Sequence, residues 1–188
     1  MNNIKIKNLN KAIYISLYLS LILGFYLNED LAGGAILDLN VHIPLLNSFK
    51  ENYLYNFLNF KDFETDHSPF YWSFINFINL PFYDTEFTFN KHFVFGNNPI
   101  EQYQKEYNAL RLIYLHICLL VPVIFYKCLK IKYKDCDQNI LVIISSLLLI
   151  SPYFRAYAIW LGETNLALLF LLGAFYFFLR LEGEKKIK

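Results

Sequence analysis

The sequence contains few cysteines and few glycines, and the motifs usually built from these residues are missing. The three cysteines, Cys118, Cys128 and Cys136, include no C-x-x-C pair. This spacing argues against a zinc site and against a disulfide framework, so we expect free thiols. The seven glycines form no Gly-rich phosphate-binding loop, and no stretch repeats at the period of a solenoid. The sequence therefore gives no support for a P-loop nucleotide site, a disulfide scaffold or a repeat array.

Apolar residues are abundant instead. They make up 56% of the 188 residues, and the mean hydropathy is +0.30, which is too high for a soluble domain of this length. The charges are segregated, because 11 of the 16 acidic residues lie between Asn28 and Asn108, where four lysines balance them. This distribution gives no reason to expect a nucleic acid as a partner. The chain is predicted to be a membrane protein.

Four apolar stretches predict transmembrane helices, at about residues 12–27, 109–126, 139–153 and 164–180. Lysines precede the first stretch and follow the second, so the positive-inside rule places both termini in the cytoplasm. No cleavage signature follows the first stretch, which is therefore interpreted as a retained anchor. The frequent Asn, Lys, Ile and Phe suggest an AT-rich bacterial genome and hence the bacterial inner (cytoplasmic) membrane. We expect residues 1–188 to form a single all-α integral membrane domain.

The stretch between the first two spans, residues 28–108, is the predicted extracytoplasmic loop. It is expected to carry short surface helices, including one over 38–49 bent by Pro44 and one over 69–83 that lies along or dips into the membrane surface. Residues 151–165 are expected to form a short outer loop. The nearby aromatic residues fit a belt at the outer interface: Tyr71, Trp72, Tyr153, Tyr157 and Trp160.

Three residues in the long loop point to chemistry: Asp38, His42 and His67. Asp38 and His42 are four residues apart, so on a helix they share one face, as a metal pair or a base with its orienting partner would. The alternative is a solvated acid on a surface helix. His67, beside Ser68 and Pro69, can donate to a phosphate at headgroup depth, or it is an ordinary residue before a helix that starts at the proline.

Three further charged residues lie at the predicted outer ends of the spans. Arg111 is at the start of the second span, and Arg155 and Glu163 are in the predicted loop 151–165. Charges at span edges are often interfacial anchors, but ionisable groups at bilayer depth are also typical of functional sites. Acids suit a hydroxyl or a metal, and Arg and His suit a phosphate, which is the combination that a transferase acting on a lipid-linked sugar phosphate needs.

In this order of elements the chain resembles the GT-C class of membrane glycosyltransferases, particularly the bacterial branch related to protein O-mannosyltransferases and lipid A aminoarabinose transferases. Those families have a first span, a long outer loop that opens with an acidic motif, a surface helix introduced by a His-Pro type pair, and a second span with an arginine at its outer end. The matching positions are Asp38 in DLNVH, His67 in HSPFYW, Arg111 in ALRL and Glu163 in LGETN. The family often has Asp-Glu where this chain has Asp38-Leu39, although Glu29 and Asp30 lie close by in the sequence.

The resemblance implies inverting transfer of a sugar from a polyprenyl-phosphate donor to an acceptor hydroxyl on the outer membrane face. Asp38 would polarise or deprotonate the acceptor, or hold a divalent metal that does so, with His42 or Asp30 as a further ligand or orienting group. His67 and an arginine, Arg111 or Arg155, would stabilise the departing lipid phosphate, and Glu163 would contribute to the same substrate site.

Members of this class usually have more than four spans. The chain is therefore expected to be the N-terminal part of a larger transferase, completed by further sequence or by a second chain, or else a truncated and inactive fragment. A non-catalytic four-span protein that binds a lipid or a partner is the alternative from another class. A transporter has less support, because no two halves repeat and no paired charges lie within the spans.

Overall fold

A computed structural model of the chain describes residues 2–29, 39–59, 68–82 and 105–185. Within these ranges the secondary structure is helical and contains no strand, which confirms the predicted all-α class. The helices, in chain order, are α1 Asn2–Tyr26, α2 Leu39–Glu51, α3 Tyr53–Leu58, α4 Pro69–Ile78, α5 Lys105–Cys118, α6 Leu120–Lys132, α7 Gln138–Ser146, α8 Pro152–Ile159 and α9 Glu163–Lys185, with 3-10 turns η2 Leu80–Phe82 and η5 Leu147–Ile150.

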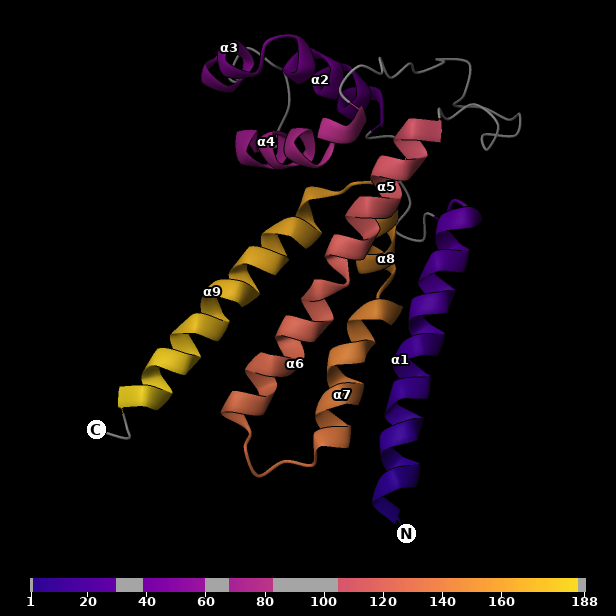
Figure 1. Cartoon of the computed structure of the whole chain (residues 1–188), viewed down its shortest axis with the longest axis vertical. Helices are drawn as coiled ribbons and strands as arrows, with labels where there is room; N and C mark the ends of the chain where they lie inside the picture. The colour runs from indigo at the N-terminus through magenta and orange to yellow at the C-terminus, as the bar shows by residue number, and fades with distance from the viewer. Residues whose placement is uncertain (1, 30–38, 60–67, 83–104, 186–188) are drawn as a thin grey trace.

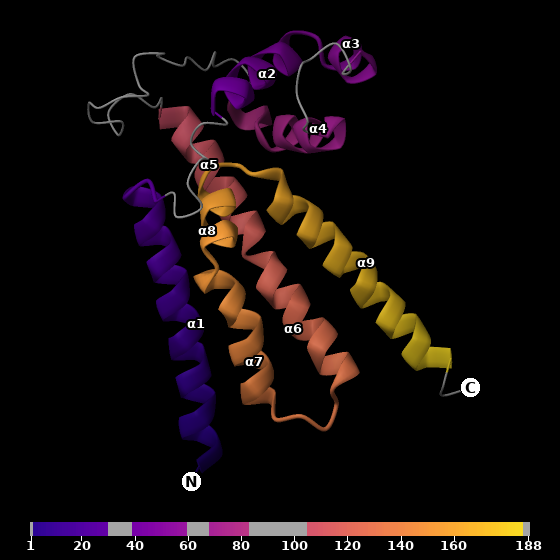
Figure 2. The same cartoon turned by 180° about the vertical axis from the view of Figure 1, so that it is seen from behind.

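The helices form a bundle with three short helices across one end. Figures 1 and 2 show α1, α5 to α8 and α9 running along the bundle, while α2, α3 and α4 lie over the end where α1 finishes and α5 begins. We call this the capped end. The start of α1 and the finish of α9 lie at the opposite end. Helices α2 and α4 occupy the segments 38–49 and 69–83 for which surface helices were predicted, and Pro44 lies inside α2.

Two helices in the described part of the chain are long and apolar enough to cross a membrane. They are Tyr107–Lys132, in which α5 and α6 run on from one another, and Glu163–Gly183 in α9. They match the spans predicted at 109–126 and 164–180. The apolar part of α1, Ala12–Tyr26, is shorter than the roughly 17 residues needed to span a bilayer. The predicted count of four spans is not confirmed.

A third apolar segment is bent. Gln138–Ile150 and Pro152–Ile159 together satisfy the same criteria, but their axes differ by 61°. Residues before proline avoid the helical region, and Ser151 has ψ 124° while its hydroxyl accepts the N–H of Phe154 at 3.4 Å. Ser151 therefore ends one helix and caps the next. The pair is either a broken span or a re-entrant segment.

The loop predicted over 151–165 is wrong in its first half, because α8 occupies that part. Helix α8 is buried, and Phe154, Ala156, Ala158 and Ile159 lie in the core. The apolar side chains at helical spacing pack inside the bundle.

The core includes large aromatic side chains near the capped end. Tyr71, Trp72 and Trp160 are almost completely buried there, while Tyr153 is exposed. The predicted aromatic belt is therefore wrong for these three residues. From α2, the buried side chains include Ile43, Leu46 and Phe49, which belong to the same core cluster as Tyr71 and Trp72 of α4. Apolar burial of this kind stabilises α2 and α4 on the bundle.

Candidate functional site

Arg155, one of the predicted site residues, is buried in the bundle and paired with the carboxylate of Glu29, three residues after the end of α1. Its Nε and Nη2 donate to the two carboxylate oxygens of Glu29 at 2.5 and 2.6 Å, which is the bidentate geometry of a strong ion pair. The side chains of Arg155 and Glu29 are 8% and 16% exposed. Two carbonyl groups also accept from this guanidinium, those of Ser20 at 3.0 Å and Leu149 at 3.2 Å.

The end of α1 places Glu29 for this contact. Asn28 has φ 52°, and the N–H groups of Asn28 and Glu29 donate to the carbonyls of Phe25 at 3.1 Å and Gly24 at 2.8 Å. This is the Schellman arrangement, in which a left-handed residue ends a helix. A Cβ at Gly24 would lie 2.8 Å from Nη2 of Arg155 and would also clash with the Glu29 carboxylate. Gly24 therefore leaves the space that the ion pair occupies.

Arg111 of α5 is the second buried arginine, with 1% exposure. Its guanidinium carbon lies 3.9 Å from the ring centroid of Trp160 and 4.9 Å from that of Phe25, so two aromatic faces enclose the cation. Its Nε donates to the carbonyl of Ile159 at 2.9 Å. Its terminal nitrogens donate to the side-chain oxygens of Asn108 at 3.0 Å and Asn28 at 3.3 Å.

Trp160 connects the two arginines. Its ring lies against Arg111, and its Nε1 donates to the backbone carbonyl of Glu29 at 2.9 Å. Arg111, Arg155, Glu29 and Trp160 thus form one network, the arginine cluster, which joins α1, α5 and α8. In the contacts described, a carboxylate and carbonyl oxygens stabilise Arg155, and amide and carbonyl oxygens together with aromatic rings stabilise Arg111. This arrangement fixes helices relative to one another.

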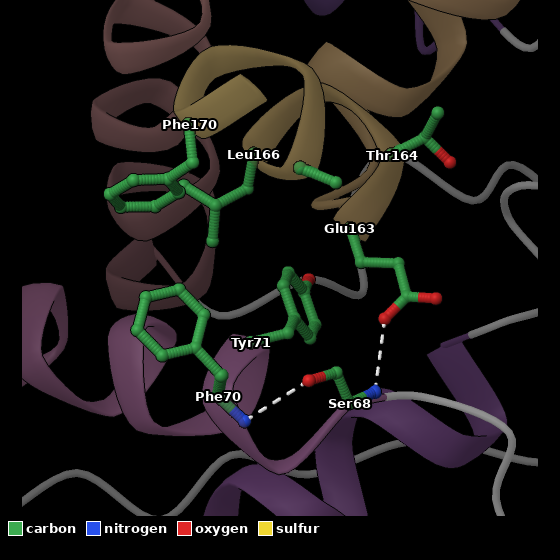
Figure 3. Close-up of a pocket in the computed structure, with 8 residues that line it drawn as sticks. Ser68, Phe70, Tyr71, Glu163, Thr164, Leu166 and Phe170 are labelled. Atoms are coloured by element: carbon green, nitrogen blue, oxygen red, sulfur yellow. Dashed lines mark hydrogen bonds between the residues drawn. The ribbon is translucent and has the colours of Figure 1, made fainter. Parts of the chain in front are cut away.

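Glu163 lies in a different place, at the edge of a pocket of about 590 Å³ between α4 and α9. The lining residues are Ser68, Phe70, Tyr71, Glu163, Thr164, Leu166, Ala167 and Phe170. Figure 3 shows the Glu163 side chain reaching toward Ser68, whose N–H donates to the carboxylate at 3.1 Å. The rings of Phe70 and Phe170 meet edge to face at 5.3 Å. The pocket therefore has apolar walls and one carboxylate at its edge.

The turn before α9 sets the position of Glu163. Leu161 has φ 61°, and the N–H of Gly162 donates to the carbonyl of Tyr157 at 2.8 Å, so α8 ends in a Schellman motif as α1 does. The hydroxyl of Tyr71 donates to the carbonyl of Leu161, and that of Tyr114 donates to the carbonyl of Gly162 at 2.5 Å. Helices α4 and α5 thus both hold this turn.

Several predicted site residues lie outside the described part of the chain. These are Asp30, Asp38 and His67, and His42 is described only as a backbone position within α2. Of the others, the structure brings Arg111 and Arg155 together in the arginine cluster. Neither arginine is among the residues that line the Glu163 pocket. The binding of a lipid phosphate by His67, Arg111 or Arg155 stays a prediction.

Glu29 was not predicted as a site residue and was named only as an acid close to Asp38 in the sequence. A signal was present, because Arg155 is the one cation between Gln138 and Glu163, and a buried cation needs a counter-charge. The partner lies 126 positions away in the chain, and no local pattern identifies it.

The described residues contain no group of three or more His, Cys, Asp and Glu side chains arranged to hold a metal ion. The divalent metal suggested by the resemblance would be held by Asp38 with His42 or Asp30 as a further ligand. Asp30 and Asp38 lie outside the described ranges, and His42 is described only as a backbone position. The three cysteines are free, as predicted from their spacing.

Comparison of the chain with protein-family models, with curated proteins and with solved structures finds no match.

Proposed function

We propose that the chain is the membrane-embedded part of a glycosyltransferase that uses a polyprenyl-phosphate sugar donor, and that the pocket between α4 and α9 receives an amphipathic substrate. The observation that carries the proposal is the form of this pocket. Apolar walls from Phe70, Leu166 and Phe170 meet the carboxylate of Glu163 at one edge. Such a combination of apolar surface and a few polar groups is typical of small-molecule sites.

The depth of the pocket supports a lipid-linked substrate. Glu163 is the first residue of α9, which is one of the helices able to cross a membrane. The pocket therefore lies where an apolar span begins, next to the short helix α4 at the capped end. At this level the hydrocarbon part of a ligand can contact apolar side chains while its polar part contacts a charged group.

Chemically, the carboxylate of Glu163 suits a hydroxyl group better than a phosphate. A carboxylate accepts a hydrogen bond from a hydroxyl and can act as its general base. No arginine or lysine lines the pocket among the described residues, so the pocket itself offers no cation to a phosphate. In the proposal, His67, which directly precedes Ser68 in the sequence, provides the phosphate contact. Asp38, which directly precedes α2, keeps its predicted role as the carboxylate that polarises the acceptor or holds a divalent metal that does so.

We assign Arg111 and Arg155 a positioning role in this proposal. Both donate to carbonyl oxygens of the bent segment, at Ile159 and Leu149. That segment leads through Leu161 and Gly162 into Glu163. Fixing α8 therefore fixes the start of α9 and with it the carboxylate in the pocket.

The test uses the natural full-length protein in membranes, with a photoactivatable polyprenyl-phosphate sugar as the probe. Ala167→Trp places a large ring in the pocket, and Ala174→Trp changes the same residue type two turns further along α9, outside the pocket. We expect Ala167→Trp to reduce photolabelling about tenfold or more, because a filled apolar pocket no longer buries the lipid. Ala174→Trp should leave labelling unchanged.

Sugar transfer by Glu163→Gln separates catalysis from binding. We expect transfer to fall by about 10²-fold or more, the usual effect of removing a general base, while labelling persists. Equal labelling of the two tryptophan variants would refute the proposal that the lipid-linked substrate binds in this pocket. Full transfer by Glu163→Gln would refute its chemical role, and lipid labelling without any transfer in the wild-type protein would favour the non-catalytic lipid-binding alternative.

A further inference from the structure

A second charged pocket lies at the other end of the bundle, between the finish of α6 and the finish of α9. Its volume is about 300 Å³, at the lower end of the roughly 300–1,000 Å³ found for small-molecule sites. The lining side chains are Ile131, Lys132, Lys134, Asp135, Leu179 and Glu182. They play no part in the arginine cluster or in the pocket beside Glu163. We call this site the lower pocket.

The lower pocket lies where both candidate membrane spans end. The span Tyr107–Lys132 finishes at a pocket residue, and the span Glu163–Gly183 finishes at Gly183, which also lines the pocket. Helix α9 packs along α6, so the two ends are held together. Because a transmembrane helix stops being apolar where the hydrocarbon layer stops, the pocket lies at the depth of lipid headgroups.

Charge distinguishes this pocket from an ordinary basic patch. Lys132 and Lys134 contribute two positive charges, and Asp135 and Glu182 contribute two negative charges, so the lining residues that the structure describes carry no net charge together. An anionic headgroup would gain from the lysines and be repelled by the carboxylates. A headgroup that carries one charge of each sign can meet both pairs at once.

The apolar residues of the pocket add a second requirement. Leu179 is buried and Ile131 is half-buried. The half-buried side chain of Ile131 therefore provides most of the apolar surface next to the four charges, as the glycerol and the first part of an acyl chain would need. A soluble zwitterion would leave this surface uncovered.

We propose that the lower pocket binds the headgroup of phosphatidylethanolamine. The phosphate lies against Lys132 and Lys134, and the primary ammonium group lies against Asp135 and Glu182. Phosphatidylcholine carries the same charges, but its quaternary ammonium has no N–H to donate to a carboxylate. Charge-assisted hydrogen bonds are stronger than neutral ones, so the acids of the pocket should favour the primary amine.

The test is native mass spectrometry of the full chain, purified into micelles that contain equal amounts of phosphatidylethanolamine, phosphatidylcholine and phosphatidylglycerol. We expect the phosphatidylethanolamine adduct to exceed each of the others by on the order of tenfold. In the double variant Lys132→Gln, Lys134→Gln the adduct should fall to the level of the other lipids. In Asp135→Asn, Glu182→Gln the preference over phosphatidylcholine should disappear, while some binding of the phosphate persists.

A matched control removes two positive charges from the same helices outside the pocket. Lys130→Gln, Arg180→Gln should keep the wild-type preference, because neither residue lines the pocket. Equal adducts for the three lipids with the wild-type chain would overturn the proposal, and so would a preference for phosphatidylglycerol. A wild-type preference that survives in both pocket variants would place the site elsewhere and overturn it as well.

Discussion

Replacing Glu29 by Gln should destabilise the bundle strongly, although the change removes only one charge. Gln keeps the shape of the side chain and one acceptor oxygen. It leaves the guanidinium of Arg155 buried without its counter-charge, because the two groups form a bidentate pair that is 8% and 16% exposed. The usual value for exposed ion pairs, about 0–1 kcal/mol, does not apply to a pair this deeply buried.

The magnitude follows from what Arg155 retains. Removing one partner of a buried ion pair costs about 3–5 kcal/mol, because the remaining charge is uncompensated. The carbonyls of Ser20 and Leu149 still accept from this guanidinium, so we expect the lower end of the range, about 3 kcal/mol. The loss should appear as a lower SDS fraction at the midpoint of reversible unfolding in mixed micelles, followed by helical circular dichroism.

A double-mutant cycle identifies the ion pair as the cause. Glu29→Gln combined with Arg155→Gln removes both charges, so the double variant should be more stable than the sum of the single losses predicts, by about 1–3 kcal/mol. Glu51→Gln, a neutralisation at an exposed position, should stay within about 0.5 kcal/mol of wild type. Strict additivity in the cycle, or a loss in Glu29→Gln no larger than in Glu51→Gln, would refute the reasoning.

Three further outcomes are expected. Arg111→Lys should lower the free energy of unfolding by about 1–3 kcal/mol in the same assay. The reason is that an ammonium group cannot both stack on Trp160 and donate hydrogen bonds in the directions that the guanidinium uses. A change below about 0.5 kcal/mol would contradict the enclosed-cation geometry. Gly162→Ala should lower it by more than Gly173→Ala, because the added Cβ would clash with a tyrosine ring in the first variant and meets nothing within 4 Å in the second; equal effects would contradict the tight turn. A membrane-impermeant maleimide should label Cys136, the one cysteine that is not buried, in inverted membranes and not in intact cells; labelling in intact cells would contradict the predicted orientation.

The apolar helices could be predicted from the sequence because their signal is local. The helix Tyr107–Lys132 has little charge between Arg111 and Lys127, and α9 runs from Glu163 to Arg180 without a charge. Such runs favour helices of membrane length whatever surrounds them. Helix α4 was also predictable, since Ser68 and Pro69 form a typical helix start.

Helix α8 could not be predicted in the same way, because its stability depends on distant residues. The segment contains Arg155, which in isolation favours a position in water. In the bundle this residue is compensated by Glu29, which follows α1. A charged residue becomes compatible with the core only once its partner is known, and that partner depends on the tertiary structure.

Part of the candidate site could likewise be predicted from the sequence, and part of it could not. Glu163 could be proposed from its place at the start of an apolar stretch, and the structure puts it at the edge of a pocket. Phe70 and Phe170, which are 100 positions apart in the sequence, form walls of this pocket because α4 lies beside α9. The sequence offers no periodic pattern that joins them.

The bend at Ser151 also affects how much water the bundle would need at membrane depth. A broken helix at membrane depth exposes backbone polar groups, which elsewhere are often hydrated by a water-filled cavity. Here protein atoms meet two of them, since Arg155 donates to the carbonyl of Leu149 and the hydroxyl of Ser151 accepts the N–H of Phe154. Because these two groups are satisfied by the protein, neither of them requires a water-filled path beside the bend.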